Sequence, residues 1–273
     1  MKEYSFFNSG FIPSEELPGG LGEACVPGLF ETMRCRQGGI VYLDRHLERL
    51  EGSSRKIKID PLFSRREIKL LIARLVQMNN YPDTLVRVSL WDNGSKSNLL
   101  ISAKRYHSLA AGKYACGFSC AISRFRQQES SIFAGIKTTS RILYELSYRE
   151  AKDKGFDEAL IFNSRGYLAE ASRSNIFFVK EKILFTPELS CGCLEGVTRK
   201  AVLDLAKRAG IPFQEGKFVI ADLLAADEAF LTNSLIGVMA LSRVENNLVG
   251  RKKSGGLYGY FTKKYAGLKR YGI

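Results

Sequence analysis

Apolar and polar residues alternate with a period of two along several stretches of the first hundred residues. LFETMRCRQGGIVYL, residues 29–43, alternates on both sides of a glycine pair, a pattern that predicts a β-hairpin. TLVRVSLW at 84–91 and SNLLISAKRY at 97–106 predict two further strands, separated by the turn residues DNGSK. We expect these strands to belong to a small N-terminal α+β domain spanning residues 1–108.

Two other stretches carry apolar residues at the three- and four-residue spacing of amphipathic helices. In residues 44–59 the apolar positions form one stripe, and Asp44 is the predicted N-cap. In residues 64–80 the stripe repeats, with Ser64 as N-cap and Glu67 three residues later to complete a capping box. Each predicted helix therefore has one apolar face to bury in this domain.

The periodicity lapses around residues 109–113, which we interpret as a linker to a larger domain over residues 114–273. Beyond it, short apolar runs alternate with helical patterns, without internal repeats. The predicted helices are RILYELSYREAKDKG, VTRKAVLDLAKRAG and a basic C-terminal segment. The predicted strands include ACGFSCAIS, EALIFN, SNIFFVK, KILFTP, ADEAFLTNS and LIGVMALSRV. The expected fold class is α+β to α/β, with short strands and outer helices in this second domain.

Composition narrows the class of protein without identifying a function. The chain has 273 residues, 45% hydrophobic and 25% charged, as in globular proteins of one large or two smaller domains. It shows neither a signal-peptide pattern nor a membrane-spanning apolar run, so the expected location is the cytoplasm. The six cysteines do not suggest a disulfide framework, and with two histidines we expect no metal site. The thiols are expected to be buried and reduced, with Cys116 and Cys120 on one packed face.

The net charge of +13 allows two interpretations. One is attraction to anions, either nucleic acid or a phosphorylated or carboxylated small molecule. The other is a set of basic residues scattered over a solvated surface. Lysine and arginine are spread along the whole chain, without a zinc-finger, RNA-recognition or helix-turn-helix signature. We therefore expect no nucleic-acid or membrane partner, and we keep small anionic substrates as candidates.

Lys137, in the stretch FAGIKTTSRILYE, has unusual neighbours for a lysine. Apolar Phe133, Ala134 and Ile136 precede it, and Arg141 follows four residues later. Desolvation and a neighbouring cation both favour loss of the ammonium proton, so this setting suits Schiff-base chemistry. The alternative is a solvent-exposed lysine between a loop and a helix, which is the commoner case for one such stretch alone.

Glu170 and Asn175 lie in a second stretch of interest, GYLAEASRSNIFFV. Glu170 ends a short predicted strand, and Asn175 belongs to the apolar strand that follows. A carboxylate in this place could bind a protonated ring nitrogen, as electron-accepting cofactors require. The alternative is a turn glutamate, with the asparagine satisfying backbone groups of a loop.

Three more segments could bind an anion. Val197 and Thr198 open a predicted helix, whose N-terminal N–H groups favour negative charge, although a plain N-cap at Thr198 is the commoner arrangement. Asn233 and Ser234 follow a strand and could supply further phosphate donors. Arg49 lies on a predicted helix near the hairpin, where the alternative is a solvated face.

The order of these segments resembles that of the fold-type IV pyridoxal-phosphate enzymes. The motifs are, in chain order, LFETMR…HLERL, GIKTTSRI, DEALIFNSRGYLAEASRSNIFFV, TPELSCGCLEGVTR and ADEAFLTNS, between about residues 28 and 244. That family holds branched-chain aminotransferases, D-amino-acid aminotransferases and 4-amino-4-deoxychorismate lyases. The resemblance implies a small N-terminal and a larger C-terminal domain, with the cofactor in the cleft between them. It also implies a homodimer whose active sites borrow residues from the partner.

The resemblance implies roles for the motif residues as well. Lys137 matches the lysine that forms the Schiff base with pyridoxal 5'-phosphate (PLP) and then acts as acid–base catalyst. Glu170 matches the glutamate that pairs with the pyridine nitrogen, so that the ring remains an electron sink. The remaining cofactor-binding positions would hold the phosphate, two of them through main-chain N–H groups: Arg49, Val197, Thr198, Asn233 and Ser234.

Within this family the motifs favour the lyase. Lys-Thr-Thr-Ser-Arg-Ile is similar to the Lys-x-x-Asn-Arg-Leu of the lyases, in which Arg141 agrees, and Ile142 stands where branched-chain aminotransferases usually have a tyrosine. Thr32 falls on the threonine of the lyase Phe-x-Thr-x-Arg motif and joins Lys137 as a candidate catalytic residue, a proton relay. Arg141 and Phe30 are candidate substrate contacts. The expected reaction converts 4-amino-4-deoxychorismate into 4-aminobenzoate, a folate precursor, and pyruvate.

Two departures from the family pattern leave the substrate open. The usual Tyr/Phe-Gly-Asp-Gly is replaced by ACVPG at residues 24–28, and a glycine- and arginine-rich loop is replaced by DNGSKSN, which offers only Lys96. The alternative is a class IV aminotransferase for a branched-chain or D-amino acid, which would use the same Lys137 and Glu170. A third interpretation is a non-catalytic anion- or nucleic-acid-binding protein, which the ordered motifs disfavour.

Overall fold

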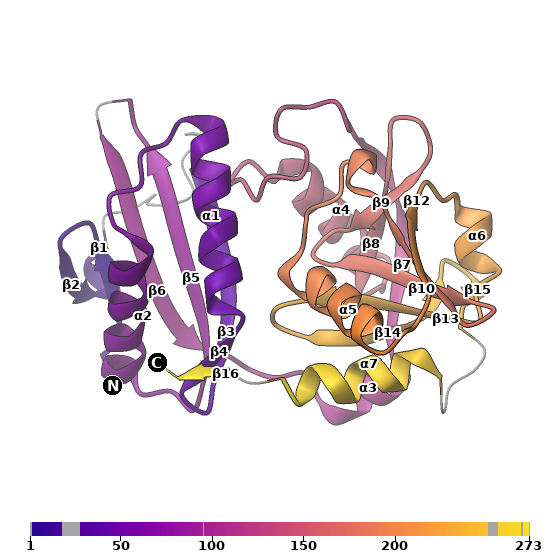
Figure 1. Cartoon of the computed structure of the whole chain (residues 1–273). Helices are drawn as coiled ribbons and strands as arrows, with labels where there is room; N and C mark the ends of the chain where they lie inside the picture. The colour runs from indigo at the N-terminus through magenta and orange to yellow at the C-terminus, as the bar shows by residue number, and fades with distance from the viewer. Residues whose placement is uncertain (1, 18–27, 95, 251–255, 269, 273) are drawn as a thin grey trace. The chain divides into compact units, whose positions relative to one another are not determined.

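The computed structural model describes residues 2–17, 28–94, 96–250, 256–268 and 270–272, which form two compact units (Figure 1). The N-terminal unit comprises the described residues of Met1–His107, Ile136–Ser140 and Lys269–Ile273. The C-terminal unit comprises those of Ser108–Gly135 and Arg141–Leu268. The replaced loop at residues 24–27, with Cys25, lies outside the described residues.

The N-terminal unit is built on a seven-stranded antiparallel sheet, counted over the described residues. Its strand order is β16-β4-β3-β5-β6-β1-β2. The strands are β1 (Tyr4–Phe7), β2 (Gly10–Pro13), β3 (Gly28–Arg36), β4 (Gly39–Val41), β5 (Asp83–Asp92), β6 (Ser97–Arg105) and β16 (Arg270–Gly272). The helices are α1 (Leu43–Ile57) and α2 (Arg65–Asn79), with a short 3-10 turn, η1 (Ser14–Glu16). The predicted hairpin is confirmed as β3–β4.

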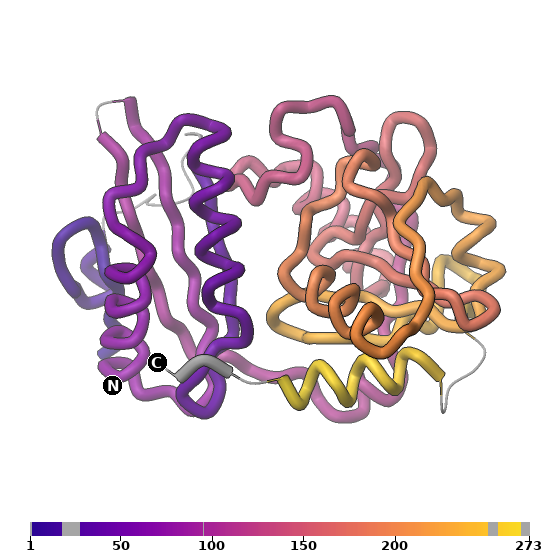
Figure 2. Tube along the Cα trace, in the orientation of Figure 1, coloured from indigo at the N-terminus to yellow at the C-terminus, as the bar shows by residue number. Residues whose placement is uncertain are grey.

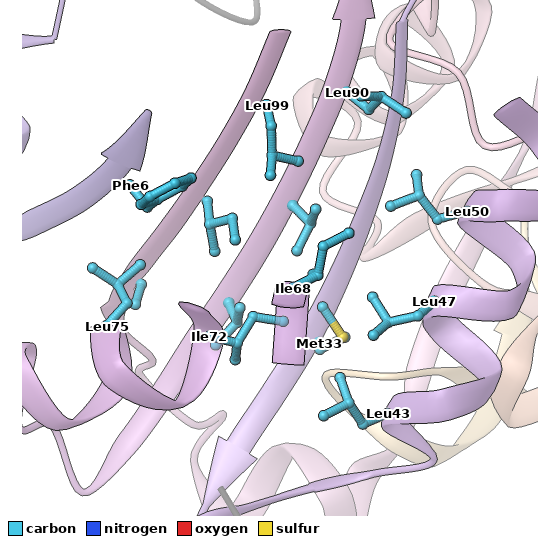
Figure 3. Close-up of a cluster of buried hydrophobic side chains, with 14 of the residues drawn as sticks. Phe6, Met33, Leu43, Leu47, Leu50, Ile68, Ile72, Leu75, Leu90 and Leu99 are labelled. Atoms are coloured by element: carbon cyan, nitrogen blue, oxygen red, sulfur yellow. The ribbon is translucent and has the colours of Figure 1, made fainter. Parts of the chain in front are cut away.

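Side chains from α1 and α2 meet those of the sheet in one apolar core, of which Figure 3 shows a part. Met33 of β3 lies between Leu47 of α1 and Ile72 of α2 in this cluster, and all three are fully buried. Because side chains alternate along a strand, the odd-numbered positions of β3 face this core and the even-numbered ones face away. This alternation decides which side of the sheet each candidate residue occupies.

The two predicted helix N-caps had different outcomes. Ser64 and Glu67 form the capping box: the Ser64 backbone N–H donates to Glu67 Oε2 (2.8 Å), and the Glu67 N–H donates to Ser64 Oγ (3.3 Å). The prediction of Asp44 as N-cap was wrong, because α1 starts one residue earlier, after Tyr42 in a left-handed conformation without a side-chain cap. Asp44 lies in the first turn and forms an ion pair with Lys69 of α2.

The C-terminal unit contains a nine-stranded mixed sheet among its described residues, ordered β12-β11-β10-β13-β14-β7-β8-β9, with β15 beside β14. The strands are β7 (Phe118–Gln127), β8 (Glu158–Asn163), β9 (Leu168–Ala171), β10 (Asn175–Lys180), β11 (Ile183–Pro187), β12 (Phe213–Gly216), β13 (Glu228–Asn233), β14 (Gly237–Val244) and β15 (Asn247–Leu248). The helices are α3 (Ala111–Cys116), α4 (Ile142–Asp153), α5 (Val197–Arg208), α6 (Ile220–Leu224) and α7 (Leu257–Ala266), with a 3-10 turn, η2 (Leu189–Cys191). In Figure 2 the yellow α7 runs beside the orange α5. Among the described helices, none combines the length and hydrophobicity needed to cross a membrane.

The boundary between the units differs from the predicted one in two ways. Residues 109–113, expected as a linker, run into helix α3, which ends at Cys116. Cys116 is therefore exposed at a helix end, and it does not share a packed face with the buried Cys120 of β7. The second difference concerns residues 136–140, which are far along the chain yet belong to the N-terminal unit. This short segment contains Lys137.

Candidate active site

The segment that holds Lys137 joins β3 through an isolated antiparallel bridge between Thr138 and Leu29. The backbone N–H of Phe30 donates to the carbonyl of Lys137 (3.0 Å), and the N–H of Thr139 donates to the carbonyl of Gly28 (2.8 Å). Gly28 allows this approach, since a Cβ there would lie 2.9 Å from Thr139 Oγ1 and 3.0 Å from Trp91 Cβ. The backbone of β3 therefore fixes the position of the candidate catalytic lysine.

The Lys137 side chain lies on the face of β3 that points away from the apolar core. Lys137 stands opposite Phe30 in the pairing, and its Nζ lies 4.5 Å from the centroid of the Phe30 ring. Lys137 is half-buried, and the preceding Ile136 packs against the core cluster of the N-terminal unit. The aromatic neighbour of the Lys137 amine comes from a distant strand, whereas Phe133, one of the apolar residues that precede Lys137 in the sequence, is 46% exposed.

A second cation lies on the same face of the sheet. Arg87 of β5 stands opposite Thr32 of β3, and its guanidinium carbon is 4.1 Å from the Phe30 ring centroid. Phe30 and Thr32 are two residues apart on one strand, so Lys137, Thr32 and Arg87 all lie around the same aromatic ring. Sequence reasoning missed Arg87. The available signal was a single charge inside the otherwise apolar strand LVRVSLW.

Arg49 lies on the helix side of β3, in a buried cluster with Glu31 and His46. Its Nε donates to Glu31 Oε1 (2.7 Å) and its Nη2 to Glu31 Oε2 (2.8 Å). His46 Nδ1 lies 2.7 Å from Glu31 Oε2. Burial raises the pKa of Glu31, yet the Arg49 charge and the hydrogen bonds of His46 and Arg49 outweigh it and hold that pKa at about 2. The solvated-face alternative for Arg49 is therefore wrong, because its side chain is only 13% exposed.

His46 connects this cluster electrostatically with Lys137. Burial lowers the pKa of the His46 imidazole, the Glu31 carboxylate acts in the opposite sense, and the charges of Arg49 and Lys137 lower it further. The ring is therefore neutral at neutral pH, and it contributes a hydrogen bond rather than a charge. Sequence reasoning had not assigned a role to His46 or Glu31.

Glu170 is the carboxylate of the C-terminal unit that the sequence singled out. It is buried and accepts hydrogen bonds from Tyr144 Oη (2.8 Å), the Leu194 N–H (3.1 Å) and Asn175 Nδ2 (3.4 Å). Burial and the charge of Glu170 both raise the pKa of the Tyr144 hydroxyl, so this group remains a donor at any physiological pH. These three donors orient the carboxylate.

Arg141 lies beside this carboxylate through its contact with Tyr144. Its Nη2 donates to the Ser172 carbonyl (2.9 Å), and its guanidinium carbon is 4.1 Å from the Tyr144 ring centroid. The next residue, Ile142, begins α4 and is 73% exposed. Arg141 therefore supports the tyrosine that donates to Glu170, while its contact with substrate stays a prediction.

The N-terminus of α5 provides backbone donors for an anion. Gly196, and not Thr198, is the N-cap residue, without a side-chain cap, and the first turn contains no acidic residue. The N–H groups of Val197 and Thr198 have no acceptor within the helix, and the helix dipole favours negative charge at this end. The hydroxyl of Thr198 lies 3.2 Å from Tyr265 Oη of α7.

The turn between β13 and β14 contains Ser234 and is organised by Asn233. Asn233 Oδ1 accepts hydrogen bonds from the N–H groups of Leu235 and Ile236, both at 2.9 Å. The turn ends at Gly237, where an added Cβ would lie 3.2 Å from the Tyr265 ring. Tyr265 thus contacts both this turn and the N-terminus of α5. Sequence reasoning placed Tyr265 on a basic helix and missed this contact.

The candidate residues therefore form one group in each unit. In the N-terminal unit, Lys137, Thr32 and Phe30 lie together, with Arg49 on the helix side of the same strand. In the C-terminal unit, the other candidates are found at neighbouring element ends: Arg141, Glu170, Val197, Thr198, Asn233 and Ser234. The two groups offer a lysine, an oriented carboxylate and an anion-binding helix end.

Comparisons with known proteins agree with this inventory. Residues 28–244 match the family described as Amino-transferase class IV. A probable branched-chain-amino-acid aminotransferase of Synechocystis sp. is 31% identical over 271 residues, which cover 90% of this chain and 86% of that relative. The aminodeoxychorismate lyase of Bacillus subtilis is 27% identical over 234 residues, covering 80% and 78%.

A solved structure shows the same architecture. The crystal structure of the branched-chain amino acid aminotransferase from Thermobaculum terrenum, in its PLP-form, superposes with a TM-score of 0.85 at 26% identity and covers 97% of this chain and 93% of its own. The two-domain fold of the fold-type IV enzymes is thereby shown for this protein. With the family match extending over most of its length, this chain is a member of the class IV aminotransferase family.

Proposed function

We propose that this protein is a PLP-dependent lyase that converts 4-amino-4-deoxychorismate into 4-aminobenzoate and pyruvate. The observation that carries the proposal is the shared face of β3, where the Lys137 amine lies over the Phe30 ring and Thr32 is two residues along the same strand. A lyase needs a proton donor for its leaving group in addition to a base, and this face offers both. The similarity to the Bacillus subtilis aminodeoxychorismate lyase supports the choice of substrate.

The residues present fit PLP as cofactor. The uncapped N-terminus of α5, with Thr198 and no acidic residue in its first turn, suits a phosphate dianion. The Glu170 carboxylate is held in place by three hydrogen-bond donors, and a carboxylate suits a protonated ring nitrogen. When bound, the cofactor supplies an aldehyde that takes an amine and a ring that accepts negative charge. Lys137 is the residue we propose to hold that aldehyde.

In the proposed reaction, two side chains of the N-terminal unit, Lys137 and Thr32, carry out the proton transfers. The Lys137 amine removes the proton from the carbon that bears the amine nitrogen of the substrate. The C–O bond to the enolpyruvyl group breaks, and the Thr32 hydroxyl relays to this group the proton that Lys137 has taken up, which turns the group into pyruvate. Arg87 is placed to bind a substrate carboxylate, since a guanidinium offers paired donors to a carboxylate. Aromatisation of the remaining ring supplies the driving force, so the protein mainly positions and moves protons.

The second candidate is a class IV aminotransferase acting on a branched-chain amino acid. Its support is the similarity to the Synechocystis relative and to the Thermobaculum terrenum structure. Position 142 weighs against it, because branched-chain aminotransferases usually carry a tyrosine there and the exposed Ile142 has no hydroxyl to offer a cofactor.

One assay separates the two functions. The purified protein with PLP is given 4-amino-4-deoxychorismate without any keto acid, and pyruvate is followed with a coupled dehydrogenase. A lyase releases pyruvate continuously, and Thr32→Ala slows it while Thr32→Ser retains most of it. Pyruvate release that stays at background, together with turnover of leucine once 2-oxoglutarate is added, would establish the aminotransferase instead.

A second experiment tests the role of Lys137 separately from the substrate. Borohydride should remove the visible absorbance of the holoenzyme and leave a modified peptide that contains Lys137. The matched control is Lys154→Ala, which alters an exposed lysine paired with Glu150 at the end of α4. The Lys137→Ala variant should show no trapped cofactor, whereas Lys154→Ala should match the parent. Trapping on any other lysine would refute the proposed role.

A further inference from the structure

We propose that Glu158 is a positioning residue for the anion-binding turn of Ser234, acting through hydrogen bonds that pass by Ser174 and Asn233. The inference rests on the proposed function in one respect, that the anion at this turn is the cofactor phosphate. Glu158 itself lies at the start of β8 and is not part of the binding site.

Glu158 is a buried carboxylate whose hydrogen-bond donors come from a single turn. It is 3% exposed. Its Oε1 accepts from Ser174 Oγ (2.7 Å), and its Oε2 accepts from the Arg173 N–H (2.9 Å) and from Ser172 Oγ (3.3 Å). All three donors belong to the turn between β9 and β10. The carboxylate therefore holds this turn in place. Because an ionised carboxylate can only accept, the groups of the turn must act as donors toward it.

The hydrogen bond from Ser174 to Glu158 also decides which group donates in the next hydrogen bond, between Ser174 and Asn233. A serine hydroxyl has one proton, and Ser174 gives it to Glu158, so its oxygen is left to accept. Asn233 Nδ2 donates to that oxygen (3.1 Å) and to the carbonyl of Arg173 (3.2 Å). With its amide nitrogen turned toward residues 173 and 174, Asn233 presents Oδ1 to the turn of Ser234.

The amide oxygen of Asn233 then holds the anion-binding turn. It accepts the N–H groups of Leu235 and Ile236, at 2.9 Å each. A flipped amide would place its NH₂ group against these two N–H donors, and donors facing donors are unfavourable. The carbonyl of Arg173 and the acceptor at residue 158, acting through Ser174, therefore both support the orientation of Asn233 and with it the turn of Ser234.

Glutamine at position 158 would disturb this sequence of donors without changing the size of the side chain. Its one oxygen can face Ser174 or the Arg173 N–H, and its NH₂ group must face the other. If the NH₂ group faces the Arg173 N–H, two donors meet. If it faces Ser174, the serine oxygen must accept and its own proton loses the carboxylate acceptor, so either arrangement costs the turn one of its hydrogen bonds. The substitution should therefore weaken binding of the anionic group of the ligand more than binding of the rest of the ligand.

The test compares two ligands that differ by a phosphate. Apo protein is titrated with PLP and with pyridoxal, and absorbance gives the dissociation constant of each. Glu158→Gln should weaken PLP binding about tenfold and pyridoxal binding less than twofold. The control is Glu245→Gln, because Glu245 accepts the backbone N–H of Ile122 and follows the end of β14 that is opposite to the Ser234 turn. It should leave the ratio of the two dissociation constants unchanged.

Ser174→Ala provides a second route if Glu158→Gln fails to fold. It removes the hydroxyl that links the carboxylate with Asn233, so it should lower PLP affinity selectively, and the double variant should be no worse than Glu158→Gln alone. Equal weakening of both ligands, or an unchanged ratio, would overturn the positioning role while leaving the proposed function intact. A parent protein that binds neither PLP nor pyridoxal would overturn the proposed function, and this inference with it.

Discussion

Replacing Glu31 by glutamine is expected to destabilise the N-terminal unit by about 3 kcal/mol at neutral pH. Burial raises the pKa of Glu31, but the Arg49 charge and the hydrogen bonds of His46 and Arg49 lower it from 4.5 to about 2. Each unit of pKa corresponds to about 1.4 kcal/mol. The ionised carboxylate, 1% exposed, is therefore worth about 3 kcal/mol of folding free energy relative to its protonated form.

The sign of this contribution defines a pH window. The pKa of Glu31 is lower in the folded than in the unfolded protein, so the stabilisation is fully present above about pH 4.5 and is lost as the pH falls toward 2. At pH 3 about 1.4 kcal/mol of it remains. Glutamine has no charge to protonate, so the variant should lack this part of the acid dependence.

The single tryptophan, Trp91, makes the measurement specific to the N-terminal unit. It is buried in β5 of that unit, so its fluorescence during urea unfolding at several pH values reports on the sheet that contains Glu31. The control is Glu51→Gln on the same helix as Arg49. Glu51 pairs with Arg65 at 26% and 34% exposure, and such an exposed pair contributes less than about 1 kcal/mol.

Two results would refute this reasoning. One is a Glu31→Gln variant whose free energy of unfolding at pH 7 lies within about 0.5 kcal/mol of that of the parent, since that is the range of ordinary surface substitutions. The other is a variant whose stability falls between pH 5 and pH 2 as steeply as that of the parent. Either outcome would mean that the buried cluster contributes no net stability, as is known for some buried ion pairs.

Three further predictions follow from individual contacts. Gly28→Ala should displace the Lys137 segment, because its methyl would lie 2.9 Å from Thr139 Oγ1, and borohydride trapping should fall while Trp91 fluorescence still shows a folded unit. Tyr265→Phe should weaken PLP binding about fivefold through loss of the contact with Thr198, with pyridoxal binding unchanged. Ser64→Ala should lower the free energy of unfolding of the N-terminal unit by about 1 kcal/mol, measured by urea unfolding, through loss of the capping box.

Local patterns predicted most elements because their causes are local. The hairpin of β3 and β4 turns at Gln37 and Gly38, both at positive φ, which a short glycine-containing loop signals in the sequence. Ser64 and Glu67 cap α2 as expected, because a capping box involves residues three positions apart. Asp44 was predicted wrongly, because the left-handed Tyr42 that precedes α1 leaves no cap position for it.

The sequence also identified the candidate residues through their order along the chain, which is enough to assign the family. It did not show which residues Arg87 and Tyr265 contact, because their partners, Phe30 and Thr198 respectively, lie more than 50 positions away. Such contacts leave no periodic signal in a single sequence.

What the sequence determined by itself is most of the elements and the family, since both depend on spacing along the chain. Only the tertiary structure decided which residues are neighbours in space. A short segment from the middle of the chain is bridged to β3 and sets Lys137 over Phe30, and Glu31 is buried against Arg49. The reason is physical: backbone pairing and burial bring together groups that are distant in sequence, and their charges and hydrogen bonds acquire strength only there.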